Sequence, residues 1–187
     1  MPEPTCSAPA RALKPETLAQ APAIIAQYPQ MRSATMPLLH LVQEDRGFIA
    51  PADMEWVADL VGVTPIQVLE VVTFYPMYRQ SPIGRRHVRV CRTLSCALRG
   101  SYSLMEELER HLQCPRGETS ADGDFTLAFV ECIADCGCGP VVHVDGAMHE
   151  NVKPEDAAAF TAKLKASLSD PSYGQKTPVP GTPEWNG

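Results

Sequence analysis

The sequence predicts a mixed protein of class α+β or α/β, in which an N-terminal helical bundle precedes a domain built on a β-sheet. In the first part of the chain, apolar residues recur every three or four positions, which is the spacing of one face of an α-helix. From His87 onward they alternate with polar residues, which is the period of a strand. A segment from Pro76 to Gly84 separates the two patterns.

Length and charge limit the class of protein. The chain has 187 residues, of which 44% are hydrophobic and 20% are charged, so it can bury a core. Its net charge of -6 gives no basic field to attract a phosphate backbone, which argues against nucleic acid as a partner. No apolar run approaches the ~20 residues that cross a bilayer, and the N-terminus lacks the apolar core of a secretory signal. We therefore expect a cytoplasmic protein.

The bundle is expected over residues 17–80, after a flexible, Pro-rich lead over residues 1–16. Its first helix is predicted around Thr17–Tyr28, and Pro29 would end it. Gly62 would end the third helix, and the capping box at Thr64–Gln67, with Pro at the first helical position, starts the fourth. The apolar faces of the four helices are Leu18, Ile24 and Ile25; Leu38, Leu39, Leu41 and Val42; Met54, Val57, Leu60 and Val61; and Leu69 and Val72.

The second domain is expected over residues 84–169. A strand over His87–Val90 runs into Cys91, and a capping box at Ser103–Glu106 opens a helix whose apolar side is Leu104, Leu108 and Leu112. The next strand carries the alternating residues Phe125, Leu127 and Phe129.

A hairpin and a helix complete this domain. The strands Val141–Val144 and Ala147–His149 flank Asp145-Gly146, a dipeptide suited to the left-handed positions of a type I′ turn. Pro154 starts the last helix, which carries Ala157, Phe160, Leu164 and Leu168 on one face and stops at Asp170-Pro171. The resulting order β-α-β-β-β-α is typical of a thioredoxin-like sheet with helices packed on it. Residues 170–187 are expected to form an extended tail, either solvated or docked on a partner through Tyr173 and Trp185.

Cysteine spacing is the most informative feature of the sequence. Cys91 and Cys96 form C-x4-C, and Cys132 and Cys136 form C-x3-C, with each pair at the end of a strand. Four sulfurs can therefore converge at one edge of the sheet. A [2Fe-2S] cluster requires four thiolates, and we predict Cys91 and Cys96 on one iron and Cys132 and Cys136 on the other.

Other roles for these cysteines stay open. Four sulfurs also suffice for structural zinc, although its usual spacing is C-x2-C. A thioredoxin-type dithiol would need C-x-x-C, and buried free cysteines that act as small hydrophobes are common. Cys6 and Cys114 are expected to be non-ligands, whereas Cys138 lies two residues from Cys136 and could substitute as a ligand.

Charged and basic residues near the cysteines give weaker signals. Arg92 and Arg99 flank the first pair, where they could stabilise a cluster of net negative charge, or be solvated or contact another subunit. The histidines show no metal-ligand spacing and are expected to be structural or surface residues: His40, His87, His111, His143 and His149.

From about Tyr28 to Leu168 the chain resembles the 24 kDa-type subunit of NADH:quinone oxidoreductase, respiratory complex I. The family pattern of an acidic residue, Phe-Thr, two cysteines four positions apart and a closing Gly-Pro occurs at Asp122, Phe125-Thr126, Cys132, Cys136 and Gly139-Pro140. The segments PLLHLVQEDRGFI, VVTFYPMY and PIGRRHVRVC also resemble the family. The chain departs from the family at Ile133-Ala134, where Leu-Gly is usual, and at Cys138.

The resemblance implies a helical bundle, a thioredoxin-like domain and one [2Fe-2S] cluster held by Cys91, Cys96, Cys132 and Cys136. It also implies tight pairing with a flavoprotein subunit that carries FMN and the NADH site, further peripheral-arm subunits, and membrane association only through the complex. The chain would be an electron-transfer subunit of an oxidoreductase with no catalytic site of its own. The absence of a G-x-G-x-x-G sequence agrees with NADH binding to the partner.

Three other functions are considered. The same type of subunit serves in soluble NAD-linked hydrogenases and formate dehydrogenases. A purely structural cluster in an interaction protein is another possibility. Residues 53–72 could form a helix-turn-helix of an iron-sulfur DNA-binding regulator, but its second helix, PIQVLEVV, has no Lys or Arg.

Overall fold

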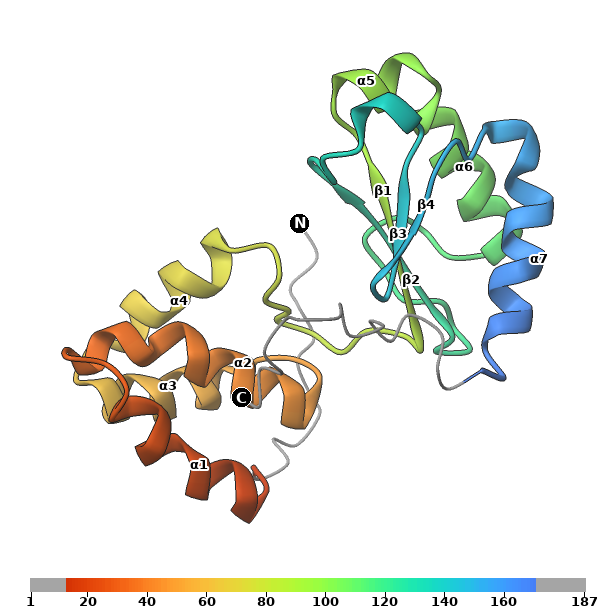
Figure 1. Cartoon of the computed structure of the whole chain (residues 1–187). Coiled ribbons are helices and arrows are strands. Elements are labelled where there is room, and N and C mark those ends of the chain that lie inside the picture. Colours follow the sequence, from red (N-terminus) through yellow and green to blue (C-terminus); the bar gives the residue numbers. More distant parts are fainter. Residues whose placement is uncertain (1–12, 171–187) are drawn as a thin grey trace, which may run out of the picture. The chain divides into compact units, whose positions relative to one another are not determined.

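The computed structural model describes residues 13–170, and these divide into two compact units that meet in sequence at Pro82 and Ile83. The first unit is helical, and the second combines a sheet with helices (Figure 1). Each unit is described by itself. The predicted lead up to residue 12, the tail from residue 171, Cys6, Tyr173 and Trp185 lie outside the described residues.

The helical unit contains four α-helices and one 3-10 turn among its described residues. These are α1 (Pro15–Ile25), η1 (Met31–Ala34), α2 (Thr35–Arg46), α3 (Pro51–Val61) and α4 (Pro65–Phe74). The predicted helix Thr17–Tyr28 was wrong at both ends. Helix α1 starts at Pro15, and it stops at Ile25 because the Gln27 and Tyr28 N–H groups donate to carbonyls only three residues back, which tightens the chain into turns.

The predicted apolar faces form the core of the helical unit. Leu38, Leu39 and Val42 of α2 are fully buried together with Val57 of α3 and Val68 of α4. The prediction that Leu18 lies on the buried face of the first helix was wrong. Leu18 is 45% exposed, whereas Thr17 and Ala21 of α1 are buried. The core therefore comes mainly from α2, α3 and α4.

Side chains fix the starts of two of these helices. The Thr64 N–H donates to the Gln67 side chain at 3.0 Å, as the predicted capping box requires. The Ala50 N–H donates to the Asp53 carboxylate at 2.7 Å, and Arg46 pairs with the same carboxylate at 3.2 Å. These bonds satisfy backbone donors that the first turn of a helix leaves without partners.

No single described helix has the length and apolar composition needed to cross a membrane. Helices α3 and α4 pass that test only when joined, and they are bent by 116° relative to each other. Both contribute side chains to the buried core of the helical unit.

The second unit is built on a four-stranded sheet with the order β2-β1-β3-β4. Strand β1 (Arg86–Cys91) is parallel to β2 (Phe125–Val130) and antiparallel to β3 (Val142–Val144), which pairs with β4 (Ala147–His149). Between β1 and β2 lie α5 (Leu94–Leu98) and α6 (Ser101–Leu112). The turn η2 (Cys136–Cys138) precedes β3, and η3 (Pro154–Asp156) leads into α7 (Ala157–Ser167).

Helices α6 and α7 lie beside one another along the sheet (Figure 1) and share a core with β1, β2 and β3. Leu104 and Leu108 of α6, Leu127 of β2 and Leu164 of α7 are all fully or almost fully buried. The arrangement is the thioredoxin-like fold that the order of elements predicted.

Two local predictions in this unit have different outcomes. The helix expected from Ser103 begins two residues earlier, because Gly100 adopts a left-handed φ of +95° and its carbonyl accepts the Leu104 N–H at 2.9 Å. The turn at Asp145-Gly146 is confirmed, since φ is +51° and +117° at the two positions.

Candidate metal centre

The four candidate cysteines lie on segments that leave the same end of the sheet. Cys91 ends β1 and Cys96 lies in α5, while Cys132 follows β2 and Cys136 starts η2. Cys91 and Cys96 are 3% and 2% exposed, whereas Cys132 and Cys136 are exposed. The structure thus provides a buried inner pair and an exposed outer pair.

The two inner thiols lie among hydrogen-bonding groups. The Cys91 Sγ lies 3.2 Å from the Thr93 hydroxyl and 3.2 Å from the Glu131 carbonyl oxygen. Burial opposes ionisation of Cys91, but hydrogen bonds from the Thr93 hydroxyl and backbone N–H, from Cys96 and from the Ile133 N–H together lower the pKa of its thiol. Of the two inner thiols, Cys91 is therefore the one whose surroundings favour ionisation.

Cys96 has the opposite shift. Burial raises the pKa of its thiol, and the nearby sulfurs of Cys91 and Cys136 add to this, against a hydrogen bond from the Val141 N–H. The surroundings of Cys96 are tight, because a Cβ added at Gly139 would lie 3.2 Å from its Sγ. A glycine at this position leaves room for the sulfur.

The outer pair is held by a tight turn. The Ala134 N–H donates to the Cys132 Sγ at 3.3 Å. Ala134 itself has a φ of +66°, a left-handed conformation that favours glycine. The resembling family usually has glycine at this position. Here the backbone adopts the left-handed conformation that glycine takes readily, although the residue is alanine.

The two arginines beside the first pair have different contacts. Arg99 Nη1 donates to the Gly137 carbonyl at 2.9 Å and the Gly139 carbonyl at 3.3 Å, so it ties the end of α5 to the loop that follows Cys136. The Arg92 Nε donates to the Glu131 carboxylate at 2.8 Å, on the exposed surface. Arg99 positions the loop, and the charge of Arg92 is paired.

This donor set fits a [2Fe-2S] cluster. Thiolates are the ligands that such clusters take, and the chain supplies four of them in two pairs. Backbone N–H groups of Thr93, Ile133, Ala134 and Val141 face the sulfurs, as expected where thiolate charge is stabilised. Gly139 leaves the space beside Cys96 free of a side chain.

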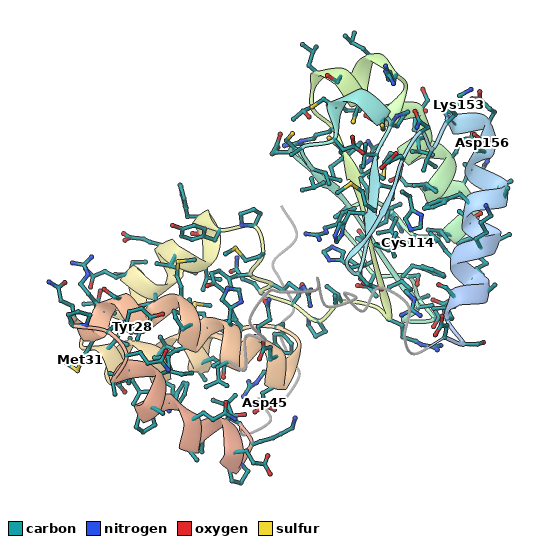
Figure 2. All side chains as sticks on the ribbon, viewed as in Figure 1. Tyr28, Met31, Asp45, Cys114, Lys153 and Asp156 are labelled. Atoms are coloured by element: carbon teal, nitrogen blue, oxygen red, sulfur yellow. The ribbon has the colours of Figure 1, made fainter. Side chains whose placement is uncertain are left out.

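The other candidate residues have contacts of their own. Cys114 lies in the core of the sheet unit (Figure 2), where burial raises the pKa of its thiol and its Sγ approaches the Glu118 carbonyl at 3.3 Å. His149 packs edge-on against Phe160, and His40 packs against Tyr78. His143 contacts Arg89 at 2.8 Å, and His111 lies 3.7 Å from Glu107.

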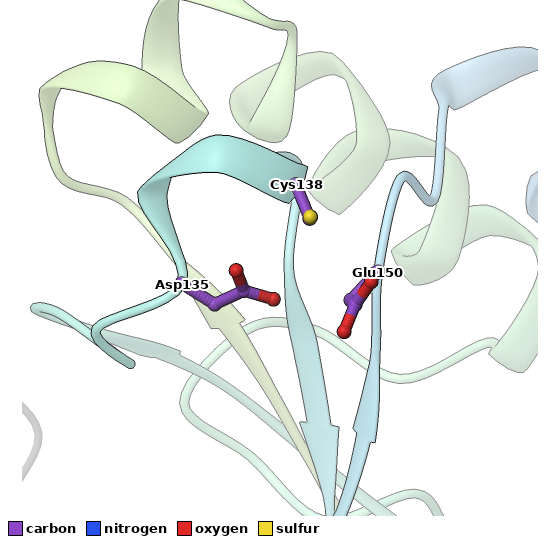
Figure 3. A group of neighbouring side chains, drawn as sticks. All are labelled: Asp135, Cys138 and Glu150. Atoms are coloured by element: carbon purple, nitrogen blue, oxygen red, sulfur yellow. The ribbon is translucent and has the colours of Figure 1, made fainter.

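Sequence reasoning missed one cluster. Asp135, Cys138 and Glu150 each place a potential ligand atom within 4.8 Å of the others (Figure 3). The Glu150 carboxylate, which accepts a hydrogen bond from the Cys138 thiol, raises the pKa of that thiol, and Asp135 adds to the shift. Cys138 stood out by its spacing, but no sequence signal joins it to Glu150, since the two are brought together by the pairing of β3 with β4 and by the hydrogen bond from the Asn151 N–H to the Cys138 carbonyl.

Comparison with known proteins identifies relatives over most of the chain. The family model for the thioredoxin-like [2Fe-2S] ferredoxin matches residues 21–165. A subunit of the NADH-quinone oxidoreductase of Rhizobium meliloti (strain 1021) is 41% identical over 144 residues, which are 77% of this chain and 84% of the relative. NADH-quinone oxidoreductase subunit 2 of Thermus thermophilus is 39% identical over 153 residues, 81% of each chain.

The corresponding NADH-quinone oxidoreductase subunit of Mycobacterium tuberculosis is 37% identical over 177 residues, covering 92% of this chain and 68% of the relative. Among solved structures, an NAD+-reducing [NiFe]-hydrogenase in the air-oxidized state has a TM-score of 0.58 at 16% identity. That match covers 71% of this chain but only 23% of the hydrogenase chain, and it shows the fold alone. The matched region contains both pairs of cysteines and confirms the resemblance drawn from the sequence, so the chain belongs to the thioredoxin-like [2Fe-2S] ferredoxin family.

Proposed function

We propose that this chain is the electron-transfer subunit of an NADH:quinone oxidoreductase and that Cys91, Cys96, Cys132 and Cys136 hold one [2Fe-2S] cluster. The observation that carries the proposal is the gathering of these four thiols at one end of the sheet unit, with N–H groups aimed at the sulfurs of Cys91, Cys96 and Cys132. Relatives at 39% and 41% identity are named as subunits of that oxidoreductase.

The proposed ligand pairs differ in environment. A bound [2Fe-2S] cluster supplies a reversible one-electron carrier. Cys91 and Cys96 would hold it from the buried side, where burial excludes water, and Cys132 and Cys136 would hold it from the exposed side. Since the surrounding N–H groups stabilise thiolate charge, they favour the reduced cluster as well.

Helix α5 offers a surface for the partner that delivers the electrons. Leu94 and Leu98 are one helical turn apart and are 74% and 79% exposed, on the same short helix that carries Cys96. Apolar side chains at such exposure are typical of interfaces, and an electron donor has to approach the cluster closely. We infer that a flavoprotein subunit with FMN and the NADH site docks here, and that the chain reaches the membrane periphery only as part of the complex.

The first experiment measures iron and acid-labile sulfide on anaerobically purified chain, with EPR spectra before and after dithionite. We expect two irons and two sulfides per chain and a signal only after reduction. Replacing any one of the four cysteines by Ser should lower the iron and sulfide content or change the EPR spectrum. Cys138→Ser is the matched control and should keep both unchanged. Zinc in place of iron, or an unaltered cluster in Cys136→Ala, would contradict the assignment.

A second experiment tests the docking surface. The double variant Leu94→Asp/Leu98→Asp should reduce the FMN that copurifies with the chain while leaving its iron content unchanged. Leu18→Asp places the same charge at a partly exposed leucine of α1 and should leave the FMN content as it is. A hydrogenase or formate dehydrogenase subunit in the copurified complex would favour the soluble alternative.

A further inference from the structure

Asp135, Cys138 and Glu150 form a cluster of metal-ligating side chains outside the four cysteines assigned to the iron-sulfur centre. Asp135 immediately precedes η2, Cys138 is the last residue of η2, and Glu150 directly follows β4. Their side chains point into the same space between the turn and the hairpin (Figure 3), and one ligand atom from each lies within 4.8 Å of the other two.

Backbone hydrogen bonds hold the three residues in place. The Asn151 N–H donates to the Cys138 carbonyl at 2.7 Å, which fixes the residue after Glu150 to the end of η2. The Cys138 N–H donates to the Asp135 carbonyl at 3.3 Å, and Val152 N–H donates to the Pro140 carbonyl at 3.0 Å. The spacing of the three side chains is therefore set by the fold of the chain on both sides.

An independent observation comes from the Asp135 carboxylate. Its Oδ2 is shielded from solvent and has no hydrogen-bond partner among the described residues. A shielded carboxylate oxygen is costly without a donor or a cation, and native proteins rarely leave one so. The atom belongs to the same side chain that faces Cys138 and Glu150.

The donor chemistry selects the ligand. One sulfur and two carboxylates suit Zn²⁺, which binds thiolate and carboxylate together, whereas Mg²⁺ and Ca²⁺ prefer oxygen alone. Ligand atoms around zinc lie about 2.0–2.3 Å from the metal, so the three side chains need to close by only about an ångström. We propose that Asp135, Cys138 and Glu150 bind a divalent transition-metal ion, with Zn²⁺ as the preferred ion and water completing its coordination.

Binding involves no change of oxidation state. The Cys138 thiol gives up its proton to solvent as the sulfur–metal bond forms, and the two carboxylates bind as anions. The site thus takes up one dication and releases one proton per chain.

The test uses the full chain, purified anaerobically with its iron and sulfide determined first. Zinc is titrated by calorimetry and by competition with a chromophoric chelator, and the absorbance of the iron-sulfur cluster is followed throughout. We expect one zinc per chain, with X-ray absorption showing one sulfur at about 2.3 Å and oxygens at about 2.0–2.2 Å. Cluster absorbance should not change as zinc binds.

Variants assign the site. Cys138→Ser and Glu150→Gln should each weaken zinc binding by more than about 100-fold, beyond the loss usual for an outer-shell residue. Glu155→Gln removes one exposed carboxylate from η3 and should leave the affinity unchanged.

Three results would overturn the proposal: no zinc bound to the full chain, equal affinity in the two ligand variants, or iron lost or its spectrum altered in Cys138→Ser. The last would make Cys138 a ligand of the cluster instead. Failure of the proposed electron-transfer function appears separately, as missing iron and sulfide in the unmodified chain before any zinc is added. In that case, comparing the zinc affinity of Cys138→Ser and Glu150→Gln with that of the unmodified chain still tests the three-residue site.

Discussion

Ala134 occupies the backbone conformation that least suits an alanine, between the two exposed cysteines. Its φ of +66° places the Cβ close to the following carbonyl oxygen, a conformation that costs an L-residue roughly 1–2 kcal/mol. The sequence comparison pointed to this residue because the family usually has glycine there. Although the residue here is alanine, its backbone adopts the left-handed conformation in which its N–H donates to the Cys132 sulfur.

Ala134→Gly should therefore stabilise the chain. Relief of the strain gains roughly 1–2 kcal/mol, and the greater freedom of glycine in the unfolded chain offsets about 0.4–1 kcal/mol of it. The net increase in the free energy of unfolding is expected to be about 1 kcal/mol or less, measured by anaerobic denaturant unfolding. Ala162→Gly, in the exposed middle of α7, should instead destabilise by about 1 kcal/mol. Equal effects at both positions would rule out strain at Ala134.

Gly137 and Gly139, which follow Cys136, test how much space the buried Cys96 sulfur has. A Cβ at Gly139 would lie 3.2 Å from the Cys96 Sγ and 3.4 Å from the Cys96 Cα, while a Cβ at Gly137 would meet nothing within 4 Å. Gly139→Ala should cost about 1–3 kcal/mol of stability and lower the iron bound per chain. Gly137→Ala should change neither by a measurable amount. Iron analysis and thermal unfolding of both variants check this, and full iron in Gly139→Ala would contradict it.

At the scale of the elements, the sequence predicted the helices and strands in which apolar residues repeat regularly. It did not predict the elements whose presence or start depends on a few residues. The four bundle helices, the parallel strands and the hairpin follow from apolar spacing and turn chemistry. Helix α5 was missed because it has five residues and its leucines face outward, so it carries no apolar period. The helix start predicted from the capping box at Ser103 was wrong, because the left-handed Gly100 already starts the helix two residues earlier.

The candidate site divides in the same way. The four cysteines could be proposed from spacing, since each pair follows a strand that the sequence predicts. The sequence could not show that one pair is buried and the other exposed, because burial of Cys91 and Cys96 depends on how Val141 and Ile133 pack around them. The proximity of Cys138 to Glu150 depends on a backbone hydrogen bond that closes the β3–β4 hairpin onto η2, and no local pattern encodes it.

Helices α1 and α2 are joined through Asp45 of α2 (Figure 2), a contact that makes a pH-dependent prediction. Its Oδ2 accepts hydrogen bonds from the Lys14 N–H and the Thr17 hydroxyl, both at 2.8 Å, and the Lys14 Nζ lies 3.3 Å from Oδ1. Burial acts to raise the pKa of Asp45, but these bonds outweigh it and hold the pKa below its ordinary value of 3.8. The carboxylate therefore stabilises the fold above pH 3.8, and this contribution is lost as the pH falls through the lowered pKa.

Asp45→Ala should reduce the free energy of unfolding by about 1.5–3 kcal/mol near neutral pH, since hydrogen bonds to a charged group are lost. The difference from the unmodified chain should shrink as the pH falls from 3.8 through the lowered pKa, because the native carboxylate takes up its proton there. Denaturant unfolding at several pH values measures this. Glu44→Ala, at the exposed neighbouring position, should stay within about 0.5 kcal/mol at every pH. A pH-independent loss in Asp45→Ala would show that the carboxylate charge is irrelevant.

At the scale of the whole molecule, the buried apolar residues fall into separate cores. One core lies in the helical unit, and two lie in the sheet unit, around the α6–α7 side of the sheet and around Cys91 and Cys96. None of these cores in the described part of the chain draws residues from both units. Loss of packing in one unit should therefore leave the core of the other intact.

Leu38→Ala and Leu104→Ala test this separation, since both leucines are fully buried, one in each unit. Each substitution should cost its own unit about 2–5 kcal/mol. In a Trp185→Phe background, fluorescence of Trp56 reports the helical unit and absorbance of the iron-sulfur cluster reports the sheet unit. Leu38→Ala should shift only the fluorescence transition, and Leu104→Ala only the absorbance transition. Coincident shifts in both variants would show a single cooperative unit.

The contrast between buried Cys91 and Cys96 and exposed Cys132 and Cys136 also sets the order in which the chain suffers oxidative damage. Peroxide and dissolved oxygen reach the outer thiols first, and a sulfenic acid formed there condenses with a neighbouring thiol to a disulfide that cellular reductants reverse. The inner thiols, packed against Val141 and Ile133, should stay reduced, which would keep half of the proposed ligand set intact. Thiol reduction should therefore restore the cysteines of a chain that has lost its iron by this route, since the damage would be confined to the pair that solvent reaches.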